Sequence, residues 1–154
     1  MTTRINLYAA NPKALEPMLA AEAYLKTSTL EPLLRDLIKM RVSQINGCAY
    51  CLHMHSRDAR SAGEREERLH LLPAWRESSL YSERERAALG WTEAVTRLAE
   101  TGAPDAEFEA LKAHFTEEEI VKLTLVIVTI NGWNRINVGF HTVHPVHAAD
   151  RAAA

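Results

Sequence analysis

The sequence has only two cysteines and no apolar run long enough to cross a bilayer. A small secreted domain stabilised by disulfides carries several cysteine pairs, so two cysteines three positions apart exclude that class. The longest aliphatic run, residues 123–130, is far shorter than the roughly 20 apolar residues of a membrane-spanning helix. The first residues also contain no apolar segment of signal-peptide length. We therefore expect a cytoplasmic protein with no membrane partner.

An excess of charge of one sign is missing as well. The 18 basic and 20 acidic residues are mixed along the chain, and the formal net charge is -2. A protein that binds nucleic acid gathers its basic residues on one surface to neutralise phosphates. We expect no nucleic-acid partner.

Low-complexity tracts, repeats and long linkers are absent, and glycine and proline contribute only 6 residues each. With 154 residues, of which 47% are hydrophobic and 25% charged, the chain has the size and composition of one globular domain. We therefore expect a single domain over residues 1–154, with its core in 29–138.

The sequence does contain many helix signals, whereas strand-like alternation is almost missing. We expect an all-α fold, a compact bundle of about six to seven helices. An N-terminal helix over 11–24 begins at the pair Asn11-Pro12, where proline fits the first helical position. Thr29 is expected to cap a second helix, which ends at Asn46-Gly47.

Two capping boxes predict where later helices begin. Ser82 with Glu85, and Thr116 with Glu119, have the spacing at which each side chain satisfies the other residue's backbone N–H. The remaining expected elements are, in chain order, a helix over 48–62, a short helix followed by a loop within 64–81, helices over 82–101, 105–113 and 116–135, and an extended tail over 139–154.

The two cysteines lie at the start of the expected third helix. Cys51 falls in the first turn if Cys48 begins the helix, and His55 follows on the same face at the i,i+4 spacing, with Asp58 three residues further. Unpaired N–H groups at a helix start favour the thiolate, and a nearby imidazole can accept a proton. The pattern indicates thiol exchange or peroxide reduction.

Two other interpretations of this motif remain open. Free cysteines are often small buried side chains with no chemical role. A zinc site would need four ligands, and Cys48, Cys51, His53 and His55 are candidates. However, His53 lies about 200° around the helix axis from Cys51 and from His55. A metal would therefore need a ligand from elsewhere in the chain, and we expect none.

Three histidines, His141, His144 and His147, recur at a spacing of three near the C-terminus. Pro145 prevents a continuous helix there, so the three side chains need not share a face. We expect a solvated terminal segment.

The motif and its surroundings resemble a known family. The run Asp36-Leu37-Ile38-Lys39-Met40-Arg41-Val42-Ser43-Gln44-Ile45-Asn46-Gly47-Cys48-Ala49-Tyr50-Cys51, followed by His55 and by Asp58-Ala59-Arg60, is similar to the AhpD-like alkylhydroperoxidase branch of the carboxymuconolactone decarboxylase-like superfamily. The segment 120–138, which contains Ile130-Asn131-Gly132-Trp133-Asn134-Arg135, resembles the same branch more loosely.

The resemblance implies the role of each candidate catalytic residue. Cys51 would be the thiolate that attacks the peroxide, and Cys48 would then form a redox-active disulfide with it, with no other cofactor. His55 would take part in a proton relay. Asp36 stands where the family has a relay glutamate, and we expect the shorter side chain to reach His55 through a water molecule. Tyr50 stands where the family can have a histidine.

The resemblance also implies partners. These are a peroxide substrate, a dithiol or thioredoxin-like protein reductant, and further copies of the chain in a dimer, trimer or hexamer. The alternatives are a non-catalytic thiol redox sensor or stress-response protein, and a carboxymuconolactone decarboxylase-like enzyme.

Overall fold

The computed structural model describes residues 2–145, and in this range it contains helices and no strands. The α-helices are α1 (Leu7–Ala10), α2 (Glu16–Lys26), α3 (Pro32–Ile45), α4 (Ala49–Ser61), α5 (Glu66–Leu71), α6 (Glu83–Thr96), α7 (Leu98–Thr101), α8 (Asp105–Lys112) and α9 (Glu117–Gly139). Two 3-10 helices, η1 (Pro12–Leu15) and η2 (Leu72–Ala74), connect some of them. The all-α prediction is confirmed.

The described residues form more helices than the six or seven expected, because some predicted helices are divided. Arg97, with φ -100° and ψ 37°, leaves the helical region and separates α6 from α7. The N-terminal helix begins with the 3-10 turn η1 before it continues as α2. The four-residue helix α1 was not expected, since its sequence is too short to show a helical period.

The prediction that Thr29 caps the second helix is wrong. Helix α3 begins at Pro32, and Glu31 is its N-cap residue without a side-chain cap bond. The residue before a proline is held in the extended region, where Glu31 has ψ 132°. Pro32 therefore determines where α3 begins.

Both predicted capping boxes are confirmed. In each, the N-cap hydroxyl accepts a hydrogen bond from the backbone N–H of the glutamate, and the glutamate accepts one from the N-cap N–H. Ser82 and Glu85 begin α6, and Thr116 and Glu119 begin α9. Helix α9 continues to Gly139, four residues beyond the expected end.

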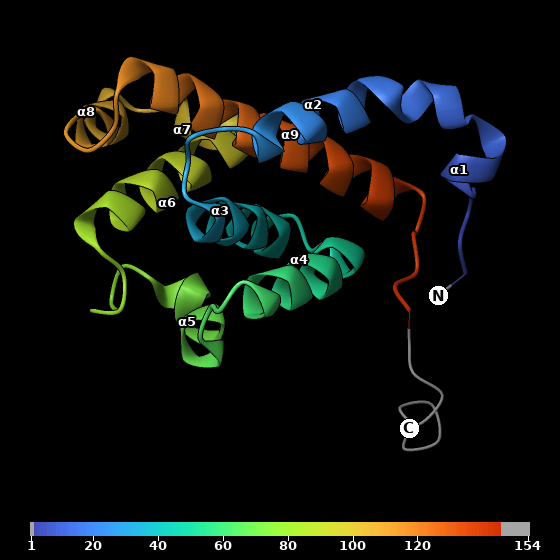
Figure 1. Ribbon diagram of the computed structural model, residues 1–154, viewed down its shortest axis with the longest axis horizontal. Helices are drawn as coiled ribbons and strands as arrows, with labels where there is room; N and C mark the ends of the chain where they lie inside the picture. Colours follow the sequence, from blue (N-terminus) through green and yellow to red (C-terminus); the bar gives the residue numbers. More distant parts are fainter. Residues whose placement is uncertain (1, 146–154) are drawn as a thin grey trace.

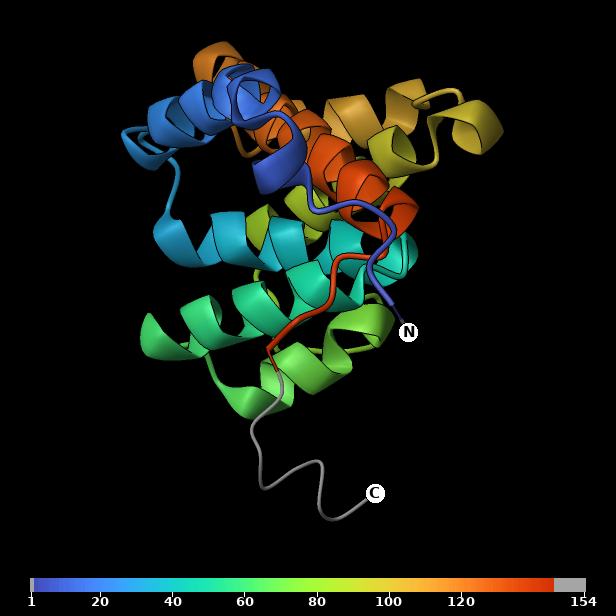
Figure 2. The same cartoon turned by 90° about the vertical axis from the view of Figure 1, so that its right-hand side faces the viewer.

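Helix α3 is the centre of the bundle. It packs against α4, α6 and α9, and α9 also contacts α2 and α4. Figures 1 and 2 show α2 and α9 side by side in an upper layer, α3 in the middle, and α4 and α5 below. One face of α3, with Ile38 and Val42, belongs to a core cluster shared with α9. Its other face, with Leu37 and Met40, packs against residues of α4, α5 and α6. Both cysteines lie in the first of these clusters.

The described part of the C-terminal tail lies against α4 (Figure 2). The His144 ring stacks on His53, with 4.8 Å between the ring centroids. His147 and the rest of the predicted tail lie outside the described residues. Within residues 2–145, no helix has the length and hydropathy that a membrane span requires.

Candidate functional site

The turn between α3 and α4 presents the cysteines. Gly47 has φ +65°, a backbone conformation that glycine adopts without steric cost. The N–H of Cys48 donates to the carbonyl of Ser43 at 3.0 Å, and the N–H of Gly47 donates to Gln44 at 3.4 Å. This pair of bonds is a Schellman motif, which ends α3 and allows the chain to enter α4 immediately.

Cys48 is the N-cap residue of α4. Its backbone is extended, with φ -86° and ψ 92°, and its sulfur accepts a hydrogen bond from the N–H of Cys51 at 3.3 Å. A disulfide joins Cys48 to Cys51, whose Cα atoms are 5.4 Å apart. Each cysteine is 1% exposed. The spacing therefore places the two sulfurs together at the start of α4, as the sequence predicted.

Cys51 and His55 line the same cavity, which has a volume of about 260 Å³. The cavity lies among residues of α1, α2, α3, α4 and α9, so its walls come from distant parts of the sequence. Much of the wall is apolar or aromatic, formed by Tyr8, Leu19, Met54, Ile130 and Trp133. Cys48 is not among the lining residues. A small molecule in this cavity would therefore meet Cys51 rather than Cys48.

His55 is held neutral by its surroundings. The residue is only 5% exposed, and its burial, reinforced by the positive charge of Lys39, lowers the pKa of the imidazole to about 3. Its Nδ1 atom lies 3.9 Å from the Asp58 carboxylate, which is 59% exposed. Near pH 7 the imidazole beside the disulfide is therefore neutral, and its lowered pKa makes it a weak base.

Asp36 lies on α3 but does not line the cavity. Burial raises the pKa of its carboxyl group, and the charge of Lys39 partly offsets this effect. Among the residues that the structure describes, Asp36 makes no hydrogen bond or ion pair with His55 or Cys51. Its place in a proton relay therefore stays a prediction.

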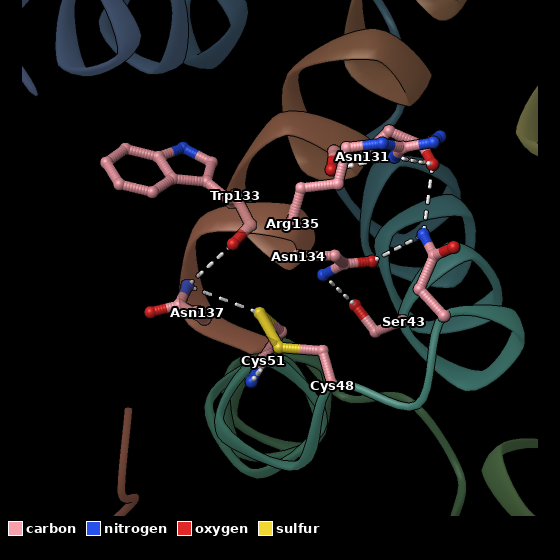
Figure 3. The surroundings of a disulfide bond; sticks show 9 residues. Ser43, Cys48, Cys51, Asn131, Trp133, Asn134, Arg135 and Asn137 are labelled. Carbon is pink, nitrogen blue, oxygen red and sulfur yellow. Dashed lines mark hydrogen bonds between the residues drawn. A yellow bond between two sulfur atoms is a disulfide. The ribbon is translucent and has the colours of Figure 1, made fainter. Parts of the chain in front are cut away.

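Sequence analysis did not identify Asn137, which contacts the sulfur of Cys51. The Asn137 side-chain amide donates to this sulfur at 3.6 Å and to the Trp133 carbonyl at 3.0 Å. Figure 3 shows Asn137 reaching from α9 to the disulfide. A signal was present, because Asn131, Asn134 and Asn137 recur every three residues in the C-terminal half of α9.

The other two asparagines connect α9 to the end of α3 (Figure 3). Asn46 donates to Asn131 at 2.9 Å and to Asn134 at 3.0 Å, and Asn134 donates to Ser43 at 3.1 Å. Buried polar groups that are fully paired restrict the packing to one arrangement. The network therefore holds the turn that carries Cys48 against α9.

An ion pair that the sequence did not predict lies at the cavity. Lys39 of α3 and Glu22 of α2 both line it, and their charged atoms are 2.6 Å apart. Their side chains are 13% and 19% exposed, so this pair is more buried than a usual surface ion pair.

The four candidate zinc ligands do not gather at the site. His53 is not among the cavity residues, and its ring stacks on His144. Over residues 2–145, no three side chains of histidine, cysteine, aspartate or glutamate form a group that could hold a metal ion.

Known proteins resemble this chain in sequence and in fold. The model of the carboxymuconolactone decarboxylase family matches residues 9–94. The uncharacterized protein YdfG of Bacillus subtilis (strain 168) is 42% identical over 138 residues, which cover 90% of this chain and 94% of YdfG. The uncharacterized protein YnjA of Escherichia coli (strain K12) is 32% identical over 112 residues, 73% of this chain and 61% of YnjA.

A crystal structure of ATU0492 from Agrobacterium tumefaciens, assigned provisionally as the antioxidant defence protein AhpD, is 53% identical. It superimposes with a TM-score of 0.92 and covers 95% of this chain and 100% of its own. The match of the family model, the similarity to these relatives and the helical fold show that the chain belongs to the carboxymuconolactone decarboxylase family, in its AhpD-like branch.

Proposed function

We propose that the protein is a thiol-dependent peroxidase of the alkylhydroperoxidase type. The observation that carries this proposal is the Cys48–Cys51 disulfide, one cysteine of which lines a cavity together with a neutral histidine. A disulfide next to a cavity suits a reaction in which the thiols are oxidised by a small molecule and then regenerated. The provisional assignment of ATU0492 to antioxidant defence points in the same direction.

The cycle begins with the reduced protein. The Cys51 thiolate attacks the terminal oxygen of a peroxide ROOH, and the O–O bond breaks. The products are a sulfenic acid at Cys51 and an alkoxide RO⁻, which takes up a proton to become the alcohol ROH. The Cys48 thiol then attacks the sulfenic sulfur, which releases water and forms the disulfide. A dithiol or a thioredoxin-like protein reduces the disulfide and becomes a disulfide itself. The net reaction consumes one peroxide and one dithiol.

Three residues near the disulfide can be assigned roles in this cycle. We assign to His55 the transfer of a proton from the Cys51 thiol to the alkoxide, because a thiolate beside the imidazole would raise its pKa above the value of about 3 that it has next to the disulfide. The Asn137 amide donates a hydrogen bond to the reacting sulfur. Asp36 would act only through water, since it makes no direct contact with His55.

Peroxide consumption tests the proposal. With tert-butyl hydroperoxide or hydrogen peroxide and dithiothreitol, we expect the wild type to turn over and Cys51→Ser to lose all activity. We expect Cys48→Ser to perform a single oxidation, which leaves a sulfenic acid at Cys51 that dimedone traps and mass spectrometry detects.

One outcome would contradict the roles of the two cysteines, and another would contradict the function. If dimedone labels Cys48 in the Cys51→Ser variant while Cys51 in the Cys48→Ser variant stays unlabelled, the roles of the cysteines are reversed. If both thiols oxidise once but the wild type never consumes peroxide catalytically, the protein is a thiol sensor rather than a peroxidase.

A further inference from the structure

The Lys39–Glu22 ion pair has no part in the chemistry above, although it lies at the reacting sulfur's cavity. Lys39 comes from α3, nine residues before Cys48, and Glu22 comes from α2. The Lys39 ammonium and the Glu22 carboxylate are 2.6 Å apart, and the two side chains are 13% and 19% exposed. A pair this sheltered is screened by water and salt much less than a surface pair.

Lys39 differs from the other charged groups around the cavity. Helix α9 contributes only neutral residues to the cavity wall. The titratable side chains come from the other helices: Tyr8 of α1, Glu22 and Lys26 of α2, Lys39 of α3, and Tyr50, His55 and Asp58 of α4. Lys26 is exposed, and Asp58 is 59% exposed, so water weakens the effect of both charges. Lys39 is therefore the sheltered cation of this cavity.

A reduced Cys51 needs such a cation. Its sulfur lies in a residue that is 1% exposed, and burial by itself favours the neutral thiol over the thiolate. Asn137 supplies one neutral donor, which stabilises a buried anion less than a full positive charge does. The charge of Lys39 already acts at His55, where it disfavours the imidazolium. The same charge acts in the opposite direction on an anion at the neighbouring sulfur.

We propose that Lys39 is a positioning residue that stabilises the anionic sulfur of Cys51, and that Glu22 holds the Lys39 ammonium at the cavity while partly offsetting its charge. This inference deepens the peroxidase function proposed above and rests on it for its biological meaning. It predicts effects of opposite sign for the two members of one ion pair. A pair that only joined α2 to α3 would give effects of the same sign, because either substitution breaks the same contact.

The test measures the rate of Cys51 alkylation by iodoacetamide against pH, in the full-length Cys48→Ser protein. Serine keeps a side-chain N-cap at this position, and only one thiol remains to be alkylated. Lys39→Met removes the charge and keeps the aliphatic stem. We expect it to raise the pKa of Cys51 by about one unit, which makes alkylation about tenfold slower below that pKa. Glu22→Gln should shift the profile in the opposite direction by a smaller amount.

Four further variants make the result specific. Lys39→Arg keeps the charge and should keep the wild-type profile, and Lys39→Gln replaces Lys39→Met if circular dichroism shows that the latter is unfolded. The matched control is the exposed pair Lys112 and Glu109 on α8, whose contact is 3.0 Å. Lys112→Met and Glu109→Gln should leave the profile unchanged.

Opposite shifts for Lys39→Met and Glu22→Gln support the inference. Shifts of the same sign, or shifts no larger than those of the control pair, overturn it. Alkylation requires no peroxide, so the two proposals can fail separately. Opposite shifts in a protein that consumes no peroxide would contradict only the peroxidase function, and unchanged profiles in an active peroxidase would contradict only the role of Lys39.

Discussion

The pKa of His55 is much lower in the folded protein than in the unfolded chain. An imidazole in an unfolded chain has a pKa near 6.5, and burial with Lys39 nearby lowers it to about 3 in the fold. Below pH 6.5 the unfolded state therefore binds a proton that the folded state does not. The stability that depends on a neutral His55 is fully present above this pH and is lost as the pH falls toward 3.

This difference predicts the acid sensitivity of the oxidised protein. Between pH 6.5 and 4, the free energy of unfolding should fall, with a contribution from His55 of up to about 1.4 kcal/mol per pH unit. His55→Gln, which is neutral at every pH, should lose this part of the slope. Urea unfolding at several pH values measures both slopes, and equal slopes would mean that His55 is protonated in the folded protein.

Asp36 shows how far a residue can be placed from sequence spacing alone. The spacing correctly placed it on the helix that leads to Cys48. It did not reveal that the side chain stays outside the cavity, whereas the carboxylates that line it are those of Glu22 and Asp58. Sequence spacing describes neighbours on one helix, and the distance between two helices depends on how they pack.

At the scale of the elements, one glycine allows the tight turn between α3 and α4. Gly47 has φ +65°, and no neighbouring atom lies within 4 Å of the Cβ that an alanine would add. Gly63, which follows α4, has φ +95° and equally open surroundings. A side chain at either position would therefore cost conformational energy without a steric clash.

The two glycines give a matched pair of variants. Gly47→Ala and Gly63→Ala should each lower the free energy of unfolding by about 1–2 kcal/mol. Only Gly47→Ala should also change the rate at which dithiothreitol reduces the disulfide, because only that turn carries Cys48. Unfolding in urea and the release of thiols from the folded protein separate these effects. Equal reduction rates in both variants would show that α4 holds the disulfide independently of the turn.

The whole molecule leaves apolar side chains on its surface, and we predict that they are covered in a homo-oligomer. On α9, Val121 is 68% exposed and Val128 is 55% exposed, and Leu98 of α7 is 56% exposed. Val128 and Leu98 line a groove of about 890 Å³ together with residues of α6 and α9. Exposed apolar side chains beside a groove are typical of an interface between subunits.

Light scattering at micromolar concentration should therefore give a mass that is a multiple of the 17.3 kDa chain. Val128→Glu should shift this mass toward one chain, because it places a charge in the proposed interface. The matched control is Leu71→Glu on α5, where Leu71 is 39% exposed outside the groove. A wild type of single-chain mass would contradict the prediction.

The sequence by itself determined the features that depend on residues close together along the chain. The two capping boxes began their helices as predicted, the spacing of Cys48, Cys51 and His55 placed them along the start of α4, and the lack of strand signals matched the all-α fold. The forces responsible act within one or two helical turns, so the local sequence contains nearly all the information.

Only the tertiary structure decided what surrounds the reacting sulfur. The Asn137 amide, the Lys39–Glu22 pair and the aromatic wall of the cavity come from helices separated by up to about a hundred residues of sequence. Their positions depend on how α2, α3 and α9 pack, which is a balance of side-chain shapes over the whole core rather than a property of any one segment. For the same reason Asp36, which matched the motif in sequence, lies outside the cavity, and Glu22, which matched nothing, lies inside it.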